Sequence, residues 1–148
     1  MWHASKHAAF SYVAAQQAYT LDDDRAFLRD SLAIESTIWL AETAAEIVGF
    51  MAIKYVPAVA DPDALLDQLF VARGRERTGI GSTLLAIAKQ LFPTGLRLYT
   101  FQRNVAARAF YEQRGFTAAC FGMSPPPDNE PDVEYRWRPG GSTGFRAG

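Results

Sequence analysis

The turn from Arg73 to Ser82 constrains the fold of this chain most, because it carries three glycines between a predicted strand and a predicted helix. The strand is the mostly apolar run 64–71, and the helix is 79–92, where apolar residues recur at helical spacing until Pro93 ends them. A glycine-bearing turn that opens into a helix presents unpaired backbone N–H groups and the positive end of the helix dipole, which favour phosphate. The sequence therefore predicts an α/β fold with a candidate phosphate site at this turn.

The spacing of the turn excludes two common nucleotide motifs. Gly74 and Gly79 have the separation of a P-loop, but Ile80 stands where the P-loop lysine is required. A dinucleotide fingerprint needs a third small residue three positions after Gly81, and Leu84 is there instead. A tight strand-to-helix turn without a ligand stays open as the structural alternative.

The rest of the chain alternates helical and strand-like patterns. Thr20, followed by the acidic residues 22–24, predicts a capped helix start with a buried stripe at Phe27, Leu28 and Leu32. The other predicted elements are a helix at 8–18, strands at 37–41, 47–55, 96–101, 116–121 and 133–137, and a helix at 104–114. The order is two helices and then β-β-β-α-β-α-β-β, an α/β layout with helices on a mixed sheet. We expect one domain over residues 1–138 and a flexible glycine-rich tail over 139–148.

Composition limits the partners and the location. The 148 residues suit one domain, and the net charge of −1 gives no general attraction for nucleic acid or an anionic membrane. Cys120 is the single cysteine, so no internal disulfide is possible and a reducing compartment is favoured. No apolar run reaches transmembrane length, and the residues from Met1 to Lys6 lack a signal-peptide core. We expect a cytoplasmic protein without nucleic-acid or membrane partners.

A second motif follows the next strand. The segment from Asn104 to Phe116 reads Asn-x-x-Ala-x-x-Phe-Tyr-x-x-x-Gly-Phe, and the first motif places Gly79 and Gly81 at a fixed distance after Val71. Together the two motifs resemble the GNAT superfamily of acetyl-CoA-dependent N-acyltransferases, over roughly Ile38 to Trp137. One position departs from the family pattern, which usually has glutamine or arginine where Glu76 stands.

The resemblance implies a fold and a cofactor site. It implies a single-domain, mostly antiparallel mixed sheet with helices on both faces, in which the strands 64–71 and 96–101 separate through a bulge. Freed backbone groups of the first strand would pair with pantetheine, and the glycine turn would hold the pyrophosphate of acetyl-CoA, the co-substrate. The cofactor-binding residues implied are Leu69, Phe70, Val71, Glu76, Arg77, Thr78, Gly79, Ile80, Gly81, Ser82 and Asn104.

The resemblance also suggests two catalytic residues. Tyr111 would give a proton to the leaving thiolate, whereas the helical pattern alone favours a core tyrosine. Asp67 is the carboxylate of the strand that floors the site and is the candidate base, although the family often places its carboxylate earlier, where this chain has Leu65 and Leu66. A structural aspartate and a water chain are the alternatives. His3 and His7 have no motif around them and are expected to be surface residues, and no metal is implied.

The predicted reaction is the transfer of an acetyl group to a primary amine of a small molecule or peptide by direct attack. The family implies that the N-terminal helices and the loop 122–132 choose the acceptor, and the acids of this loop suit a cationic amine or are simply solvated. A catalytically degenerate CoA-binding domain, which would not need Tyr111, and an interaction module are the alternatives. The segment 1–7 is too short and polar for the first strand of the family. Either that strand is missing, which would expose a sheet edge that a partner could cover, or the chain begins late, and a homodimer is expected.

Overall fold

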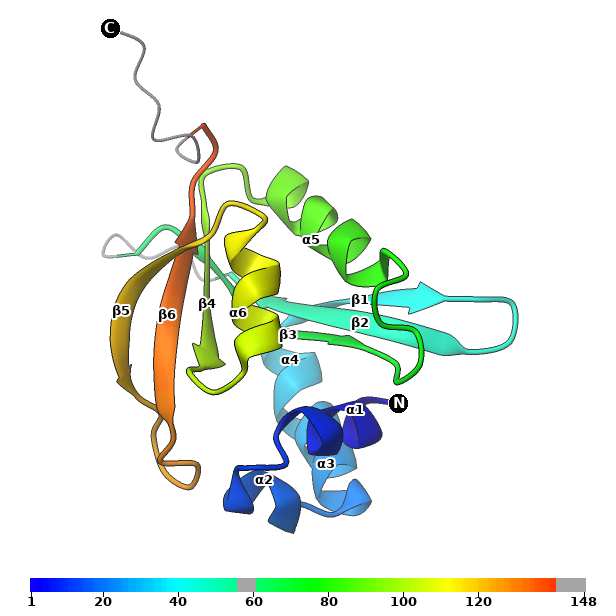
Figure 1. Ribbon diagram of the computed structural model, residues 1–148. Coiled ribbons are helices and arrows are strands. Elements are labelled where there is room, and N and C mark those ends of the chain that lie inside the picture. The colour runs from blue at the N-terminus through cyan, green and yellow to red at the C-terminus, as the bar shows by residue number, and fades with distance from the viewer. Residues whose placement is uncertain (56–60, 141–148) are drawn as a thin grey trace, which may run out of the picture.

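The protein, described by a computed structural model over residues 1–55 and 61–140, is a single α/β domain built on one six-stranded sheet (Figure 1). The strand order is β1-β2-β3-β4-β6-β5, and each neighbouring pair is antiparallel except β3 and β4, which are parallel. The strands are β1 (Thr37–Glu42), β2 (Ile47–Lys54), β3 (Ala64–Val71), β4 (Leu96–Phe101), β5 (Thr117–Met123) and β6 (Pro131–Trp137). The mixed, mostly antiparallel sheet is confirmed.

The two helices after β3 and β4 follow the predicted order, whereas the region before β1 contains more helical segments than the two predicted. The helices are α1 (Trp2–Ala9), α2 (Ala14–Ala18), α3 (Leu21–Phe27), a π-helical turn η1 (Leu28–Leu32), α4 (Ala33–Glu35), α5 (Ile80–Leu91) and α6 (Val105–Glu112). Of the predicted tail 139–148, residues 141–148 lie outside the described part of the chain. Within the described residues, no helix combines the length and apolar character needed to cross a membrane.

The prediction of one helix over 8–18 was wrong. Most of the segment 1–7, which was expected to be too short and polar for a strand, lies in α1, and the chain then turns before α2. Val13 adopts an extended conformation at the turn and is only 2% exposed, so burial of this side chain decides the local backbone. Tertiary packing has overridden local periodicity here.

The capped helix start at Thr20 is confirmed, whereas the buried stripe behind it is confirmed only in part. Thr20 and Asp23 form a capping box, in which each side chain accepts a hydrogen bond from the other residue's backbone N–H. Leu32 is fully buried, but Phe27 and Leu28 are exposed. The π-helical turn η1 changes the rotation per residue, so residues chosen at α-helical spacing no longer share one face.

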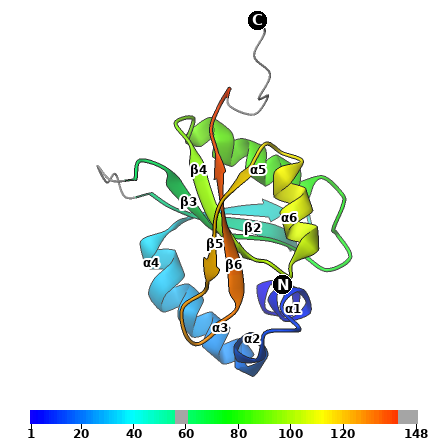
Figure 2. The ribbon, with the colours of Figure 1, turned by 60° about the vertical axis from the view of Figure 1, so that its left-hand side comes forward.

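Helices cover both faces of the sheet, as predicted. Met51 and Ile53 of β2 belong to the main core beneath α5, while Phe50 and Ala52 pack in a second core with Leu32. Figures 1 and 2 show α5 on one face of β1–β3 and α1–α4 on the other. Strand β2 is therefore buried on both sides, which its nearly continuous apolar sequence reflects.

The splayed central strand pair is confirmed too. The ladder between β3 and β4 has only two pairings, Ala64 with Leu96 and Leu65 with Arg97, after which the strands part. On its other side β3 contains a bulge, because Ala52 pairs with Gln68 and the next residue of β2 pairs with Leu66. Asp67 is the extra residue of this bulge. The bulge and the early end of the ladder open the sheet at its centre.

The second core should contribute measurably to stability. Leu32→Ala removes a side chain that is 0% exposed, so we expect the free energy of unfolding to fall by about 2–5 kcal/mol. Ile34→Ala, at a position 75% exposed, should change it by less than about 0.5 kcal/mol. Chemical denaturation of both variants tests this, and equal losses would contradict the assignment of Leu32 to a core.

Candidate functional site

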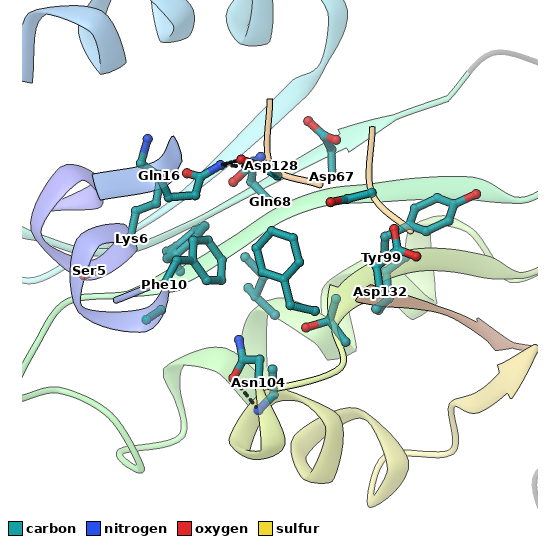
Figure 3. A pocket seen from close by; sticks show the side chains of 18 of the residues that line it. Ser5, Lys6, Phe10, Gln16, Asp67, Gln68, Tyr99, Asn104, Asp128 and Asp132 are labelled. Atoms are coloured by element: carbon teal, nitrogen blue, oxygen red, sulfur yellow. Dashed lines mark hydrogen bonds between the residues drawn. The ribbon is translucent and has the colours of Figure 1, made fainter. Parts of the chain in front are cut away.

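A cleft of about 1180 Å³ lies where β3 and β4 separate. Its floor is formed by residues 66–71 of β3 and 98–101 of β4, and α1, α6 and the segment before β6 complete its walls. Figure 3 labels Asp67, Gln68, Tyr99, Asn104 and Asp132 among the side chains that line it. Of the predicted site residues, those that line the cleft are Asp67, Leu69, Phe70, Val71, Glu76, Asn104 and Tyr111.

The glycine turn lies beside one end of the cleft and leads into α5. Gly74, Arg77 and Gly79 have positive φ values of 83°, 63° and 90°, so the turn depends on the left-handed conformation that glycine favours. No side chain among the described residues caps the N-terminus of α5. The backbone N–H groups of its first turn therefore face outward with the positive end of the helix dipole, the arrangement that binds phosphate.

Glu76 shapes this turn. Its carboxylate accepts a hydrogen bond of 2.6 Å from the backbone N–H of Gly74, so the side chain stabilises the loop by a contact within it. Arg75 forms an ion pair with Glu46 at 2.9 Å. The structure thus gives Glu76 a role within the loop at the one position that departs from the family pattern.

Gly81 lies where α5 meets the Phe110 ring of α6. A Cβ atom on Gly81 would lie 3.4 Å from Cζ of Phe110, at the short end of ordinary van der Waals contact. Next to it, Ser82 Oγ accepts hydrogen bonds of 2.7 and 3.1 Å from the guanidinium of Arg114, which also covers the Phe110 ring at 3.9 Å. These contacts fix the N-terminus of α5 against the helix that carries Tyr111.

A size series at Gly81 should separate packing from ligand binding. Gly81→Ala adds one methyl group that the Phe110 ring can accommodate by a small shift, so we expect nearly unchanged stabilisation by acetyl-CoA. Gly81→Val adds two further methyl groups and should force α5 away from α6, weakening acetyl-CoA binding by at least about tenfold, or 1.4 kcal/mol. Calorimetric titration measures both, and equal affinities in the two variants would contradict the account.

Tyr111 faces both the core and the cleft. Its ring packs edge-on against Phe110 and Phe116, with centroids 5.1 and 5.4 Å away, yet the residue lines the cleft. Burial raises the pKa of the Tyr111 phenol well above its usual range, so the group is neutral at physiological pH. Tyr111 is therefore a packed side chain that lines the cleft with a neutral hydroxyl, and its role as a proton donor stays a prediction.

Asn104 caps α6 as predicted. Its Oδ1 accepts a hydrogen bond of 3.2 Å from the backbone N–H of Ala107. This leaves the side-chain amide nitrogen as a donor, and in Figure 3 that nitrogen points into the cleft.

Asp67 is a poorly solvated carboxylate on the floor of the cleft, with a side chain 23% exposed. Burial is the largest influence on the Asp67 pKa and raises it, and the Glu35 carboxylate also raises it. The Lys54 ammonium, 3.9 Å away, and a hydrogen bond from Gln68 lower the pKa. Lys54 is itself held by Glu35 at 2.9 Å. The net result is a carboxylate more basic than an ordinary aspartate, which is the property that a general base requires.

Further acidic side chains line the cleft: Asp128 and Asp132 belong to the loop 122–132, whose acids were expected near the acceptor, whereas Glu134 was not singled out. Asp132 and Glu134 of β6 line it opposite β3, and Tyr99 donates a 3.4 Å hydrogen bond to Glu134. Burial, followed by the Glu134 carboxylate, raises the pKa of Asp132. Glu134 was missed because β6 reaches the cleft only by pairing with β4, which no local pattern shows.

The acids of the loop 122–132 divide by their partners. Glu130 is buried and forms a two-point ion pair with Arg103, at 2.6 and 2.7 Å, so it supports the fold. Asp128 lines the cleft and accepts hydrogen bonds of 2.8 and 3.0 Å from Gln16 of α2.

His3 and His7 are not the surface residues that were predicted. Both are half-buried, their rings lie 4.1 Å apart, and His3 contacts Asp24 of α3 at 2.5 Å. The contact was missed because Asp24 is brought to α1 only by the folding of α3.

The sheet thus opens at a parallel strand pair next to an uncapped helix N-terminus, and a neutral tyrosine lines the cleft between the strands. In a comparison with protein families, the acetyltransferase (GNAT) family model matches residues 2–116. The chain belongs to this family.

Individual relatives support the assignment. The chain is 33% identical over 105 residues to the probable N-acetyltransferase Rv2775 of Mycobacterium tuberculosis, a match covering 68% of this chain and 59% of the relative. It is 32% identical over 117 residues to the 5-NmdU N-acetyltransferase of Pseudomonas phage PaMx11, covering 77% and 82%. Among solved structures, a suspected streptothricin acetyltransferase from Bacillus anthracis, in complex with acetyl-coenzyme A, is similar with a TM-score of 0.60 and 27% identity, over 70% of this chain and 62% of that one. The chain thus spans about three fifths of the first and third of these proteins.

Proposed function

We propose that this protein transfers an acetyl group from acetyl-CoA to a primary amine of a small molecule or peptide by direct attack. The observation that carries the proposal is the parting of β3 and β4 beside the uncapped N-terminus of α5, with Tyr111 at the cleft between them. The acetyl-CoA complex of the similar Bacillus anthracis protein supports the choice of co-substrate.

Acetyl-CoA would bind along β3 and end at the glycine turn. Beyond Leu65, β3 is free of β4, so its backbone can pair with pantetheine as an added strand would. The pyrophosphate would lie at the amides of residues 79–82, and the Asn104 amide would donate to pantetheine. This division agrees with where the predicted cofactor-binding residues lie: 69–71, Glu76 and Asn104 line the cleft, whereas residues 77–82 form the turn and the N-terminus of α5.

The chemical step would proceed in a direct order. The amine nitrogen attacks the thioester carbonyl carbon, the oxyanion is stabilised by a backbone N–H near Phe70, and the C–S bond breaks to release the CoA thiolate. The raised pKa of Tyr111 makes it a weaker acid than a thiol, so we assign it a hydrogen bond to the developing thiolate sulfur rather than complete proton transfer. The proton that the attacking amine loses goes to Asp67 directly or through water.

The acceptor is best described as a cationic amine. Asp67, Asp132 and Glu134 line the cleft, and the first two have raised pKa values because burial leaves their negative charge poorly stabilised. A positively charged group on the acceptor, in addition to the reacting amine, would stabilise these carboxylates. A phosphate group on the acceptor would be repelled by them. The related phage enzyme is named a 5-NmdU N-acetyltransferase, which makes 5-NmdU an informative acceptor for comparison.

Release of CoA tests the acceptor class. Incubation of the purified protein with acetyl-CoA and a panel of diamines, a basic dipeptide and an aminomethyl nucleoside 5′-phosphate should give faster thiol release with the dicationic amines. Preference for the phosphorylated acceptor would contradict the electrostatic argument. Binding of acetyl-CoA without turnover on any amine would favour the alternative of a catalytically degenerate CoA-binding domain.

The proposal also includes a cytoplasmic location and a homodimer. A cytoplasmic location agrees with a single cysteine, which is exposed and free. A homodimer is supported by the edge strand β1, whose Leu40 is exposed beside open backbone groups.

A further inference from the structure

The first and third helices bring together three potential metal ligands outside the proposed acetyl-transfer chemistry. His3 and His7 belong to α1 and Asp24 belongs to α3. One ligand atom from each lies within 4.8 Å of the other two. The histidines are four residues apart, which places both rings on one face of a helix. Asp24 is only 4% exposed, which is unusual for a carboxylate.

The hydrogen bonds around the cluster fix the orientation of the three side chains. One oxygen of Asp24, Oδ1, accepts a hydrogen bond from the Lys6 ammonium, and the other, Oδ2, lies 2.5 Å from Nδ1 of His3. His7 Nε2 lies 2.9 Å from the carbonyl oxygen of Tyr19. Since a carbonyl can only accept, Nε2 of His7 carries the proton and Nδ1 keeps its lone pair. A histidine whose second nitrogen donates to a backbone carbonyl is the usual form of a metal ligand.

We propose that His3, His7 and Asp24 form a binding site for a divalent transition-metal ion, best suited to zinc. Two imidazoles and one carboxylate are a ligand set that zinc accepts, with a fourth position left for water. A separation of up to 4.8 Å between ligand atoms closes to tetrahedral geometry with small rotations of the side chains. Lys6 orients Asp24 by its far oxygen and leaves Oδ2 toward the histidines, while its charge moderates the affinity.

The consequence of binding would be structural. Trp2, Ser5 and Lys6 of α1 line the acceptor side of the cleft, as do Asp24 and Phe27 of α3. A metal ion joining α1 to α3 would hold two parts of this wall in place through contacts between distant segments. The site therefore would tune the rigidity of the acceptor side without taking part in the transfer step.

Cobalt(II) titration of the full chain tests the site independently of acetyl transfer. The experiment uses metal-free protein in a Cys120→Ser background, so that the exposed thiol cannot contribute a ligand. We expect one equivalent of Co²⁺ to give the intense visible absorption of a four-coordinate ion, zinc to displace it, and the thermal midpoint to rise. His7→Gln, in a half-buried position, should lose the absorption while keeping the metal-free midpoint, and His3→Gln should do the same.

Two results would overturn the proposal. One is the absence of a visible band at millimolar Co²⁺ in protein that unfolds cooperatively. The other is a band that persists unchanged in both histidine variants, which would place the ion elsewhere on the chain.

Discussion

Tyr111→Phe should lower kcat by about 10²- to 10³-fold while leaving the affinity for acetyl-CoA within about threefold of the original value. The variant keeps the ring that packs on Phe110 and Phe116 and removes only the hydroxyl. If that hydroxyl stabilises the developing thiolate, its loss affects the transition state and not the ground state. Thiol release under saturating amine measures kcat, and titration calorimetry measures the binding of acetyl-CoA.

Tyr135→Phe is the matched control. Tyr135 is fully buried and donates a 2.6 Å hydrogen bond to Glu112, but it does not line the cleft. Its variant should lower the unfolding midpoint and leave the turnover of the folded enzyme nearly unchanged. Similar kcat values for Tyr111→Phe and the parent protein would return Tyr111 to a purely structural role.

Asp67→Asn should lower kcat/KM by about 10²-fold or more at neutral pH. It should also remove the acidic limb of the pH profile, which is the rise of kcat/KM with pH at the acidic end. The base must be unprotonated to accept the proton of the amine, so activity rises as pH passes through the pKa of Asp67. Because burial raises that pKa, the limb should lie above the range of an ordinary aspartate. Stopped thiol-release assays across the acidic range give the profile.

Two neighbours of Asp67 should move this limb in opposite directions. Lys54 lowers the pKa of Asp67, so Lys54→Met should shift the limb to higher pH. Glu35 raises it, so Glu35→Gln should shift the limb to lower pH. A limb that stays in place in both variants would assign the base to another group or to water.

Local signals in the sequence identified most elements of the fold. Strand 96–101 and the cap at Asn104 were predicted to the residue, because a run of β-forming residues and a side-chain cap both act within a few positions. The splayed strands followed from the family resemblance. The helix break at Val13 and the π-helical turn before Leu32 depend on burial against distant strands, which periodicity does not contain.

The candidate site divides in the same way. Tyr111 and Asp67 were singled out because a motif or the strand position marks them, and both line the cleft, while their catalytic roles stay predictions. The acids of the loop 122–132 were expected on the acceptor side, and Asp128 and Asp132 do line the cleft. Glu134 and Asp24 were not expected there, since Glu134 reaches the cleft through the β4–β6 pairing and Asp24 meets His3 across two helices.

Thermal unfolding with and without acetyl-CoA tests the central claim most directly. At about 100 times the dissociation constant, a ligand bound only by the folded state stabilises it by about 2.7 kcal/mol, a shift of roughly 5–10 °C for a domain of this size. The account predicts this shift with acetyl-CoA and CoA, and none with AMP or NAD, which lack pantetheine. No shift at millimolar acetyl-CoA would mean that the glycine turn and the parted strands hold no CoA, and the proposed enzyme activity would be wrong.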